Sequence, residues 1–255
     1  FLFLADLHIR GWRLLFFASL FFFPVVMWIG SNLQESERYQ HHRKLSKNIG
    51  TSRKQKLIIS RVIFLAAVAF LLFIFVSPAS QFRNEFLRDE RNFSAAKITL
   101  FLVTAHTPQI IGVAIAAKLS DRKGRKPVAA IAVGLGSFFT VCAYSFSGFG
   151  MWAVAVLSGI ISAGAGPSLG VYGAEMFGTG KRGQINGFLS LIAVLGSAVG
   201  LLLCGYLSEG LGSFGKTFTI LSICPFIVVL IIIFFFPESA NQELEDLNPE
   251  DKAIT

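Results

Sequence analysis

Long apolar runs constrain the fold of this chain more than any other feature of its sequence. The hydrocarbon core of a bilayer is about 30 Å thick, so a spanning helix needs about 20 residues at 1.5 Å each. Seven runs of that length occur, with charges only near their ends: 11–30, 57–76, 95–117, 128–146, 150–171, 187–207 and 217–236. Because 53% of the residues are hydrophobic and 27 are phenylalanine, we predict an all-α, polytopic membrane protein.

Basic residues are distributed unevenly between these runs. If every run spans, the loops 31–56 and 118–127 lie on one side with residues 181–182 and the C-terminus, and this side holds fifteen Lys and Arg. The loops between runs on the opposite side hold five with their edges, namely Arg83, Arg88, Arg91, Lys97 and Lys216. The positive-inside rule then predicts that the basic loops and the C-terminus are cytoplasmic. We expect these charges to set topology beside anionic lipid and not to bind nucleic acid.

The one long polar stretch between two runs divides the chain. We predict that residues 1–30 hold the end of an earlier helix, an outer loop and one further helix, and that 31–56 form a central cytoplasmic loop. Residues 57–236 are predicted to form a six-helix bundle, and 237–255 a cytoplasmic tail. Within the bundle, "GIISAGAGPSLG" at 159–170 predicts a weakened helix, and the G-x-x-x-G spacing at 196–200 predicts close helix packing.

Side chains suited to metal binding or catalysis are sparse. His41 and His42 are adjacent in a basic loop without a third ligand nearby, so we expect no metal site and no cofactor. An intramembrane enzyme would need paired carboxylates, or a nucleophile with its base, inside the runs, and the sequence contains neither. We therefore do not expect an enzyme.

The charged stretch "AKLSDRKGRK" at 117–126 resembles the signature loop of the major facilitator superfamily, G-x-L-[AS]-D-R-x-G-R-[RK]. The residues in register include Asp121, Arg122, Gly124, Arg125 and Lys126, while Ala117 replaces the leading glycine. Further stretches resemble its sugar-porter-like branch in family order: "QESERY" at 34–39, "GPSLGVYGAEMFGTGKRG" at 166–183 and "PESANQELED" at 237–246. The resemblance implies helices six to twelve, the back half of a twelve-helix secondary transporter that works by alternating access.

The resemblance also implies a charge network that holds the cytoplasmic side in one conformation. A carboxylate is favoured at a helix N-terminus, and an Arg fork can bind a carboxylate through two bonds. By analogy, Asp121 is expected at the start of the helix near Gly187. Arg122 and Arg125 are expected to pair with acidic residues, and the remaining members of the network are Gly124, Lys126, Glu175, Arg182, Glu238, Glu35 and Arg38.

In such transporters the solute binds near the bilayer midplane, and the clearest polar group there is "TAHTPQ" at 104–109. Thr104, His106 and Gln109 are therefore candidates for substrate binding, with His106 and Gln109 on one helix face at i, i+3. An ionisable side chain inside the membrane is costly, so its presence there favours a functional role. A neutral His bonded across a helix interface, for packing alone, is the alternative. If transport is proton-coupled, either His106 takes part or the acid lies in the front half.

The solute itself stays open at this point. The run 61–76 lacks the Gln-Gln and Asn of the family's helix seven, and Leu169 and Gly170 replace its helix-ten Pro and Trp. A glucose-type solute is therefore not expected, whereas an organic acid, another small metabolite or a drug-like compound fits. We expect a multi-pass protein of the plasma membrane whose partners are a small solute, protons, lipid and an N-terminal half. A truncated membrane protein without transport activity, or a half-transporter that needs a partner, is the alternative.

Overall fold

A computed structural model describes residues 20, 22–32, 52–172, 176–177 and 182–238. The chain divides into two compact units, residues 1–47 and 48–255. The described part of the first unit is the helix α3 (Phe23–Asn32). Half of the predicted run 11–30 therefore lies outside the described residues, as does most of the predicted loop 31–56.

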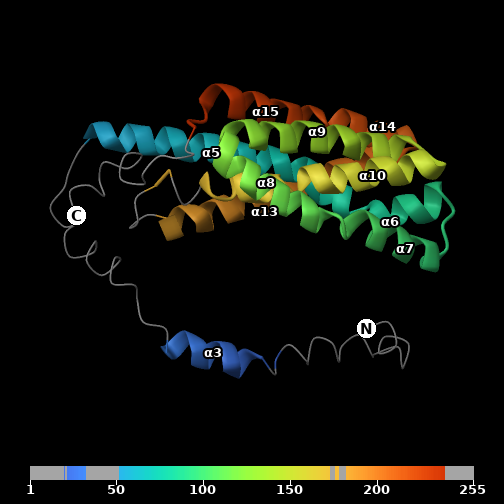
Figure 1. The fold of residues 1–255 in the computed structure, drawn as a ribbon, viewed down its shortest axis with the longest axis horizontal. Coiled ribbons are helices and arrows are strands. Elements are labelled where there is room, and N and C mark those ends of the chain that lie inside the picture. Colours follow the sequence, from blue (N-terminus) through green and yellow to red (C-terminus); the bar gives the residue numbers. More distant parts are fainter. Residues whose placement is uncertain (1–19, 21, 33–51, 173–175, 178–181, 239–255) are drawn as a thin grey trace. The chain divides into compact units, whose positions relative to one another are not determined.

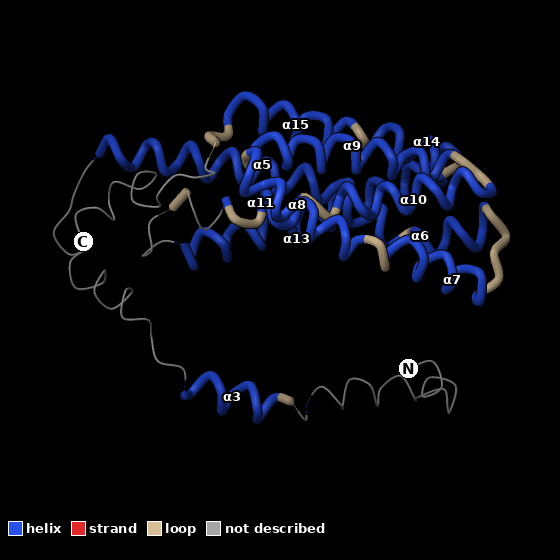
Figure 2. The backbone as a smooth tube through the Cα atoms, viewed as in Figure 1, coloured by secondary structure: helices blue, strands red, loops and turns tan. Residues whose placement is uncertain are grey.

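The described residues of the second unit are helices joined by short loops and turns (Figure 2). Six stretches are long and apolar enough to span a membrane, as the sequence predicts for this part of the chain. The elements are α5 (Ser52–Gln81), α6 (Arg83–Glu85), the π-helix η2 (Phe86–Glu90), α7 (Ala95–His106), α8 (Gln109–Lys123), α9 (Arg125–Ser145), α10 (Gly148–Ser162), α11 (Ala165–Leu169), α13 (Arg182–Leu211), α14 (Phe214–Leu221) and α15 (Ile223–Phe235).

Several of these spans are interrupted where the sequence predicts weak helix. Pro108 has no N–H to continue the helical ladder, and α7 ends two residues before it. The glycine-rich stretch ends α10 at Ser162, and the short α11 follows. One prediction needs correction: the helix expected to start near Gly187 begins at Arg182, so Gly187 lies inside α13.

The two longest helices, α5 and α13, pack closely against each other, and the remaining helices pack around them. Helix α5 runs beside α13, α9 runs beside α10, and α15 lies against both α5 and α9 (Figure 1). The predicted close packing is confirmed at Gly200, where an added Cβ would come within 2.7 Å of the Cα of Ile74 in α5. Gly196 meets the carbonyl of Phe70 in the same way, so both glycines are needed for backbone contact.

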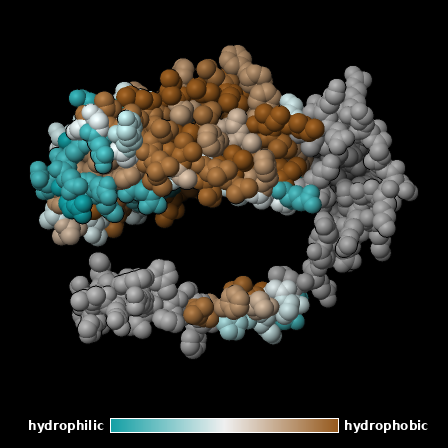
Figure 3. Space-filling model, turned by 180° about the vertical axis from the view of Figure 1, so that it is seen from behind, coloured by the Kyte–Doolittle hydropathy of each residue, from teal (hydrophilic) through white to brown (hydrophobic). Residues whose placement is uncertain are grey.

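The core consists of two clusters, one toward each end of the bundle. Near the turn after η2, the rings of Tyr144 and Phe218 lie 4.1 Å apart between centroids, and Phe75 packs on Phe218. The other cluster includes Tyr172, Val228 and further aliphatic residues. Figure 3 shows a hydrophobic band over the middle of this unit, with hydrophilic residues toward its ends. This pattern is typical of a membrane-embedded helical bundle.

We call the end that carries the α8–α9 junction, the start of α13 and the end of α15 the basic end. The other end carries η2 and the starts of α7, α10 and α14 (Figure 1). The described members of the predicted charge network lie at the basic end, namely Asp121, Arg122, Gly124, Arg125, Lys126, Arg182 and Glu238. The candidate substrate-binding residues lie between the two ends, at the α7–α8 break.

Candidate functional site

The carboxylate of Glu238 caps helix α9 at the basic end. The backbone N–H of Arg125 donates to Glu238 Oε1 at 2.8 Å, and that of Lys126 donates to Oε2 at 3.2 Å. Two of the four N–H groups that a helix start leaves without helical partners are thereby satisfied, and the negative charge lies at the positive end of the helix dipole. The C-terminal segment is thus bound to a residue 113 positions earlier in the chain.

Gly124 makes this cap possible. Its φ of 108° belongs to a region that side chains rarely adopt, and it joins α8 directly to α9. A Cβ built there would lie 2.5 Å from Glu238 Oε2 and 2.9 Å from its Cδ. Both the backbone conformation and the space therefore require glycine at this position.

Three more side chains bind the chain segments of the basic end to one another. The hydroxyl of Tyr172, fully buried, donates to the carbonyl of Pro237 at 3.1 Å. Arg61 of α5 donates from Nη1 to the carbonyl of Met176 at 2.9 Å. Arg182, the first residue of α13, donates from Nε to the carbonyl of Phe177 at 2.7 Å. Polar contacts thus join α9 and Tyr172 to the segment after α15, α5 to Met176 and α13 to Phe177.

The described residues of the predicted charge network differ in their exposure and in their hydrogen bonds. Asp121 and Arg122 are exposed at the end of α8, and neither has a hydrogen-bond partner among the described residues. Glu238 is one of the acidic residues among which sequence reasoning left the partners of Arg122 and Arg125 open, and it accepts the main-chain bonds described above. Three predicted members lie outside the described residues, namely Glu175, Glu35 and Arg38.

A second polar cluster lies halfway along the span formed by α7 and α8. The side-chain amide of Gln109 lies 2.6 Å from His106 Nδ1, across the helix break. The guanidinium Nη1 of Arg83, in α6, lies 3.2 Å from His106 Nε2. His106 is exposed on the surface of the bundle, and the other two side chains are half-buried. Both ring nitrogens of an intramembrane histidine are therefore engaged.

Thr104 belongs to this stretch but serves its own helix. Its hydroxyl lies 2.8 Å from the carbonyl of Leu100 and 3.0 Å from that of Phe101, and donates to them. Ser and Thr within helices often bond in this way to the preceding turn. The structure brings His106 and Gln109 together, while the Thr104 hydroxyl is directed at the main chain.

Sequence reasoning missed three residues that take part in the polar contacts described above. Arg83 counts by sequence as a charge of the opposite loops, but α5 is followed by further helical turns, which bring Arg83 beside α7. Arg61 reads as a residue near the membrane edge, and Tyr172 as part of a family motif. Among them, only Tyr172 carries a usable sequence signal, because it lies in the stretch that resembles the end of the tenth helix.

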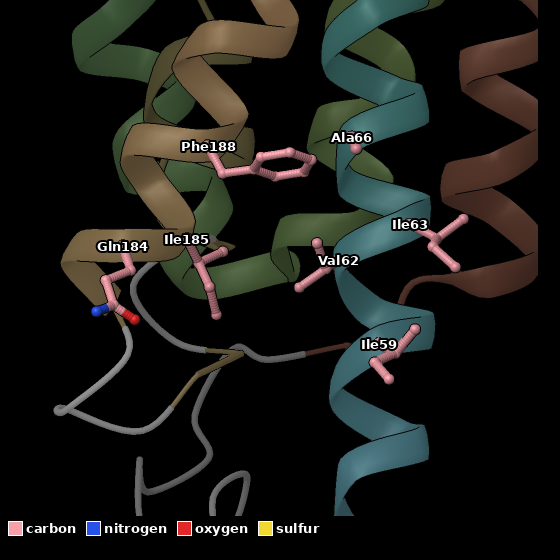
Figure 4. Close-up of a pocket in the computed structure, with 7 residues that line it drawn as sticks. All are labelled: Ile59, Val62, Ile63, Ala66, Gln184, Ile185 and Phe188. Carbon is pink, nitrogen blue, oxygen red and sulfur yellow. The ribbon is translucent and has the colours of Figure 1, made fainter.

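A cavity of about 390 Å³ lies between α5 and α13 near the basic end. Figure 4 shows the ring of Phe188 extending from α13 toward Ala66 of α5. The lining is aliphatic or aromatic except for Gln184. Such a surface suits apolar atoms and offers little to orient a polar solute. Within the described residues, no three His, Cys, Asp or Glu side chains come together as a metal site requires.

The six spans, the polar network at one end and the mid-span histidine define a polytopic helical membrane protein of the transporter class. The family model of the Major Facilitator Superfamily matches this sequence over residues 62–253. The chain belongs to this family. Its predicted all-α membrane fold and its predicted family are thus confirmed.

Similar proteins agree with this assignment. The chain is 25% identical over 246 residues to the glycerophosphoinositol transporter 1 of Saccharomyces cerevisiae, covering 91% of this chain and 46% of that protein. It is 24% identical to the cis,cis-muconate transport protein of Acinetobacter baylyi, covering 90% of this chain and 58% of that protein. The chain thus spans about half the length of these relatives.

Solved structures show the same fold. The proton:xylose symporter XylE, bound to 6-bromo-6-deoxy-D-glucose, matches with a TM-score of 0.60 at 19% identity, covering 83% of this chain and 46% of XylE. A double Trp mutant of XylE matches with a TM-score of 0.54 at 18% identity, covering 74% of this chain and 48% of the mutant. At this identity the likeness concerns the fold.

Proposed function

We propose that this chain forms half of a secondary active transporter that moves a small solute by alternating access, in symport with protons. The observation that carries the proposal is the cluster of His106, Gln109 and Arg83 on the surface of the bundle, halfway along a span. Polar groups at that depth are costly unless they contact a partner or line an aqueous cavity. The second half of the transporter, contributed by an N-terminal bundle, supplies the opposite wall of that cavity.

His106 is the group through which we expect protons to act. Imidazole is the side chain whose ordinary pKa lies near physiological pH, so small changes in its surroundings bind or release a proton. No Asp or Glu occupies the middle of a span in this sequence. The side chain of Gln109 adds polar contacts for the solute. The hydroxyl oxygen of Thr104 adds another, through the lone pair that faces the proposed aqueous cavity.

The names of the similar proteins support transport of a small solute. They refer to a glycerophosphoinositol transporter, a cis,cis-muconate transport protein and a proton:xylose symporter. Because these solutes differ widely, the names support the class of function and not one solute. The XylE name also supports coupling to protons.

The contacts at the basic end act as a latch in this proposal. Glu238, Gly124 and the amides of Arg125 and Lys126 hold the α8–α9 junction to the segment after α15. Asp121, Arg122 and Arg182 join this network in the conformation that closes the cavity on that side. The basic end faces the cytoplasm, and the membrane is the plasma membrane.

The first experiment measures uptake by the natural transporter in proteoliposomes with a proton gradient. The probes are cis,cis-muconate, glycerophosphoinositol and xylose. We expect gradient-driven uptake of one of them, reduced at least about tenfold by His106→Ala, since general proton transfer groups contribute that much or more. Thr99→Val is the matched control, because Thr99 makes a local bond to Ala95 in the same helix. Uptake that is equal in His106→Ala and the control would refute the role of His106.

A further inference from the structure

We propose that Arg83, His106 and Gln109 bind the anionic group of the transported solute, a carboxylate or a phosphate, and that the anion and a proton bind together. The inference rests on the proposed transport function and adds the chemical class of the solute. It follows from the direction of the hydrogen bonds at His106, from the charge of Arg83 and from the depth of the cluster.

The hydrogen bonds at His106 have a defined direction. Arg83 only donates, so His106 Nε2, 3.2 Å from its Nη1, must accept with its lone pair. The proton of the neutral ring is then on Nδ1, which lies 2.6 Å from Gln109 Nε2. Because two donors cannot bond to each other, we assign the Gln109 amide in the orientation turned by 180°, in which Oε1 accepts from Nδ1. Gln109 therefore turns its oxygen to His106 and presents its NH₂ group elsewhere. Both neighbours of the ring thus keep N–H donors for a ligand.

Arg83 brings a positive charge to the cluster without a negative partner. It forms no ion pair with any carboxylate in the described part of the chain. Its guanidinium lies near the hydroxyl of Tyr144, which donates to the carbonyl of Ala79 at 2.6 Å. The guanidinium is therefore held in place from one side and can present its planar fork to a carboxylate or phosphate, which it binds through two parallel bonds.

The cluster lies within the membrane-spanning part of the bundle. His106 is 11 residues from Ala95 and 17 from Lys123, the ends of its span, or about 16 and 25 Å along a helix. Arg83 lies seven residues from Glu90, the end of its own span, or about 10 Å along a helix. A cation inside a span is costly unless paired, so an anionic solute there offsets part of that cost. The same argument disfavours a neutral solute, which would leave the charge of Arg83 uncompensated.

Arg83 and a proton compete for the same lone pair of His106. With Arg83 in place, Nε2 has no site for a proton, and the positive guanidinium opposes a second charge nearby. An anion that draws Arg83 toward itself exposes Nε2, and a proton added there gives the anion a second positive partner. By linkage, the anion then raises the proton affinity of the site by the factor by which the proton raises anion affinity.

Few other charged groups face this cluster. Arg83 is the charged residue in contact with His106, and Glu85 of the same short helix is exposed. In η2, Arg88 pairs with Asp89 at 2.8 Å, and Glu90 accepts a bond from the N–H of Phe214. In α7, Lys97 lies over the ring of Phe93, and the charged residues of α8 lie at its far end. Helix α10, which also packs on α7, contains no Asp, Glu, Lys, Arg, His, Cys or Tyr.

The test measures binding to the purified natural transporter by calorimetry. The probes are cis,cis-muconate as a carboxylate, glycerophosphoinositol as a phosphate diester and xylose as a neutral solute. We expect one of the anions to bind and xylose not to bind. Arg83→Gln should weaken anion binding at least about tenfold, the loss of one charge-assisted contact. Arg88→Gln is the matched control and should change it less than about twofold, as expected of an exposed pair. Which anion binds distinguishes a carboxylate site from a phosphate site.

The coupling between anion binding and proton binding is tested by the pH dependence of anion affinity. Anion affinity should rise as the pH falls from about 8 to about 5, the range in which histidine titrates, because the bound state holds one more proton. His106→Gln should remove this dependence. If Arg83→Gln does not fold, Arg83→Lys keeps the charge without the planar fork and should still bind more weakly than the natural protein.

The possible results separate the inference from the proposed function. Binding of xylose alone, no binding of either anion at millimolar concentration, anion binding unchanged in Arg83→Gln or a pH-independent affinity would each overturn the inference. Proton-driven uptake of a neutral solute that is indifferent to Arg83 would do the same while leaving the transport function in place. Anion binding that depends on Arg83, without uptake in proteoliposomes, would support the site and refute the transport function.

Discussion

Replacing Gly124 by Ala should destabilise the basic end by an amount that the structure allows us to work out. The backbone at φ 108° and ψ 149° costs a side-chain-bearing residue about 1–3 kcal/mol. The new methyl group would also lie 2.5 Å from Glu238 Oε2, so the carboxylate must leave the two amides that it caps. Loss of a helix cap costs about 1 kcal/mol. We expect a total loss of about 2–4 kcal/mol.

A double-mutant cycle with Glu238→Ala separates these two contributions. In that background the methyl group no longer meets the carboxylate, and only the backbone cost remains. Gly124→Ala should then cost about 1 kcal/mol less than in the natural protein. The assay is reversible unfolding of the purified protein in detergent. Gly148→Ala is the control, because Gly148 has φ 60° with open space around it and tests backbone strain alone.

One outcome of the double-mutant cycle would refute this reasoning. If the costs of Gly124→Ala and Glu238→Ala add within about 0.5 kcal/mol, the two positions are independent. The methyl group at position 124 would then not displace the carboxylate of Glu238, and the space argument for glycine at the α8–α9 junction would be wrong.

Three further predictions use the same unfolding assay. Tyr172→Phe should cost about 1 kcal/mol by removing a buried hydroxyl bond, and an unchanged midpoint would show that this bond contributes nothing. Gly200→Leu should cost about 3 kcal/mol by forcing α5 away from α13, whereas Gly205→Leu, in the same helix but with open space, should cost far less. Thr140→Val should cost about 1 kcal/mol, because the hydroxyls of Thr140 and Ser158 pair at 2.7 Å between α9 and α10; stabilisation would contradict this.

The positions of the membrane helices were largely predictable because hydropathy and length are local properties. All six spans of the second unit overlap predicted runs, and the resemblance of the charged loop to the major facilitator superfamily led to the correct family. Pro108 and the glycines of 159–170 marked helix breaks through their own backbone chemistry. The predicted domain limits and the candidate substrate residues stay predictions.

The helix ends were harder to predict. Helix α13 starts at Arg182 and α5 at Ser52, each five residues before the apolar run begins. A helix continues beyond the membrane for as long as its backbone bonds are satisfied, and polar residues in water allow that as well as apolar ones do. Apolar runs therefore mark the membrane-embedded part of a helix and not its ends.

The sequence by itself determined which segments cross the membrane, where those helices break and which glycines allow close packing. The tertiary structure decided which polar groups meet. Glu238 reaches the amides of Arg125 and Lys126, 113 and 112 positions away, because Gly124 turns the chain with a positive φ and leaves room for the carboxylate. Arg83 reaches His106 because its helix lies beside α7. Such contacts depend on the relative placement of whole helices, which packing over many residues sets and no local pattern encodes.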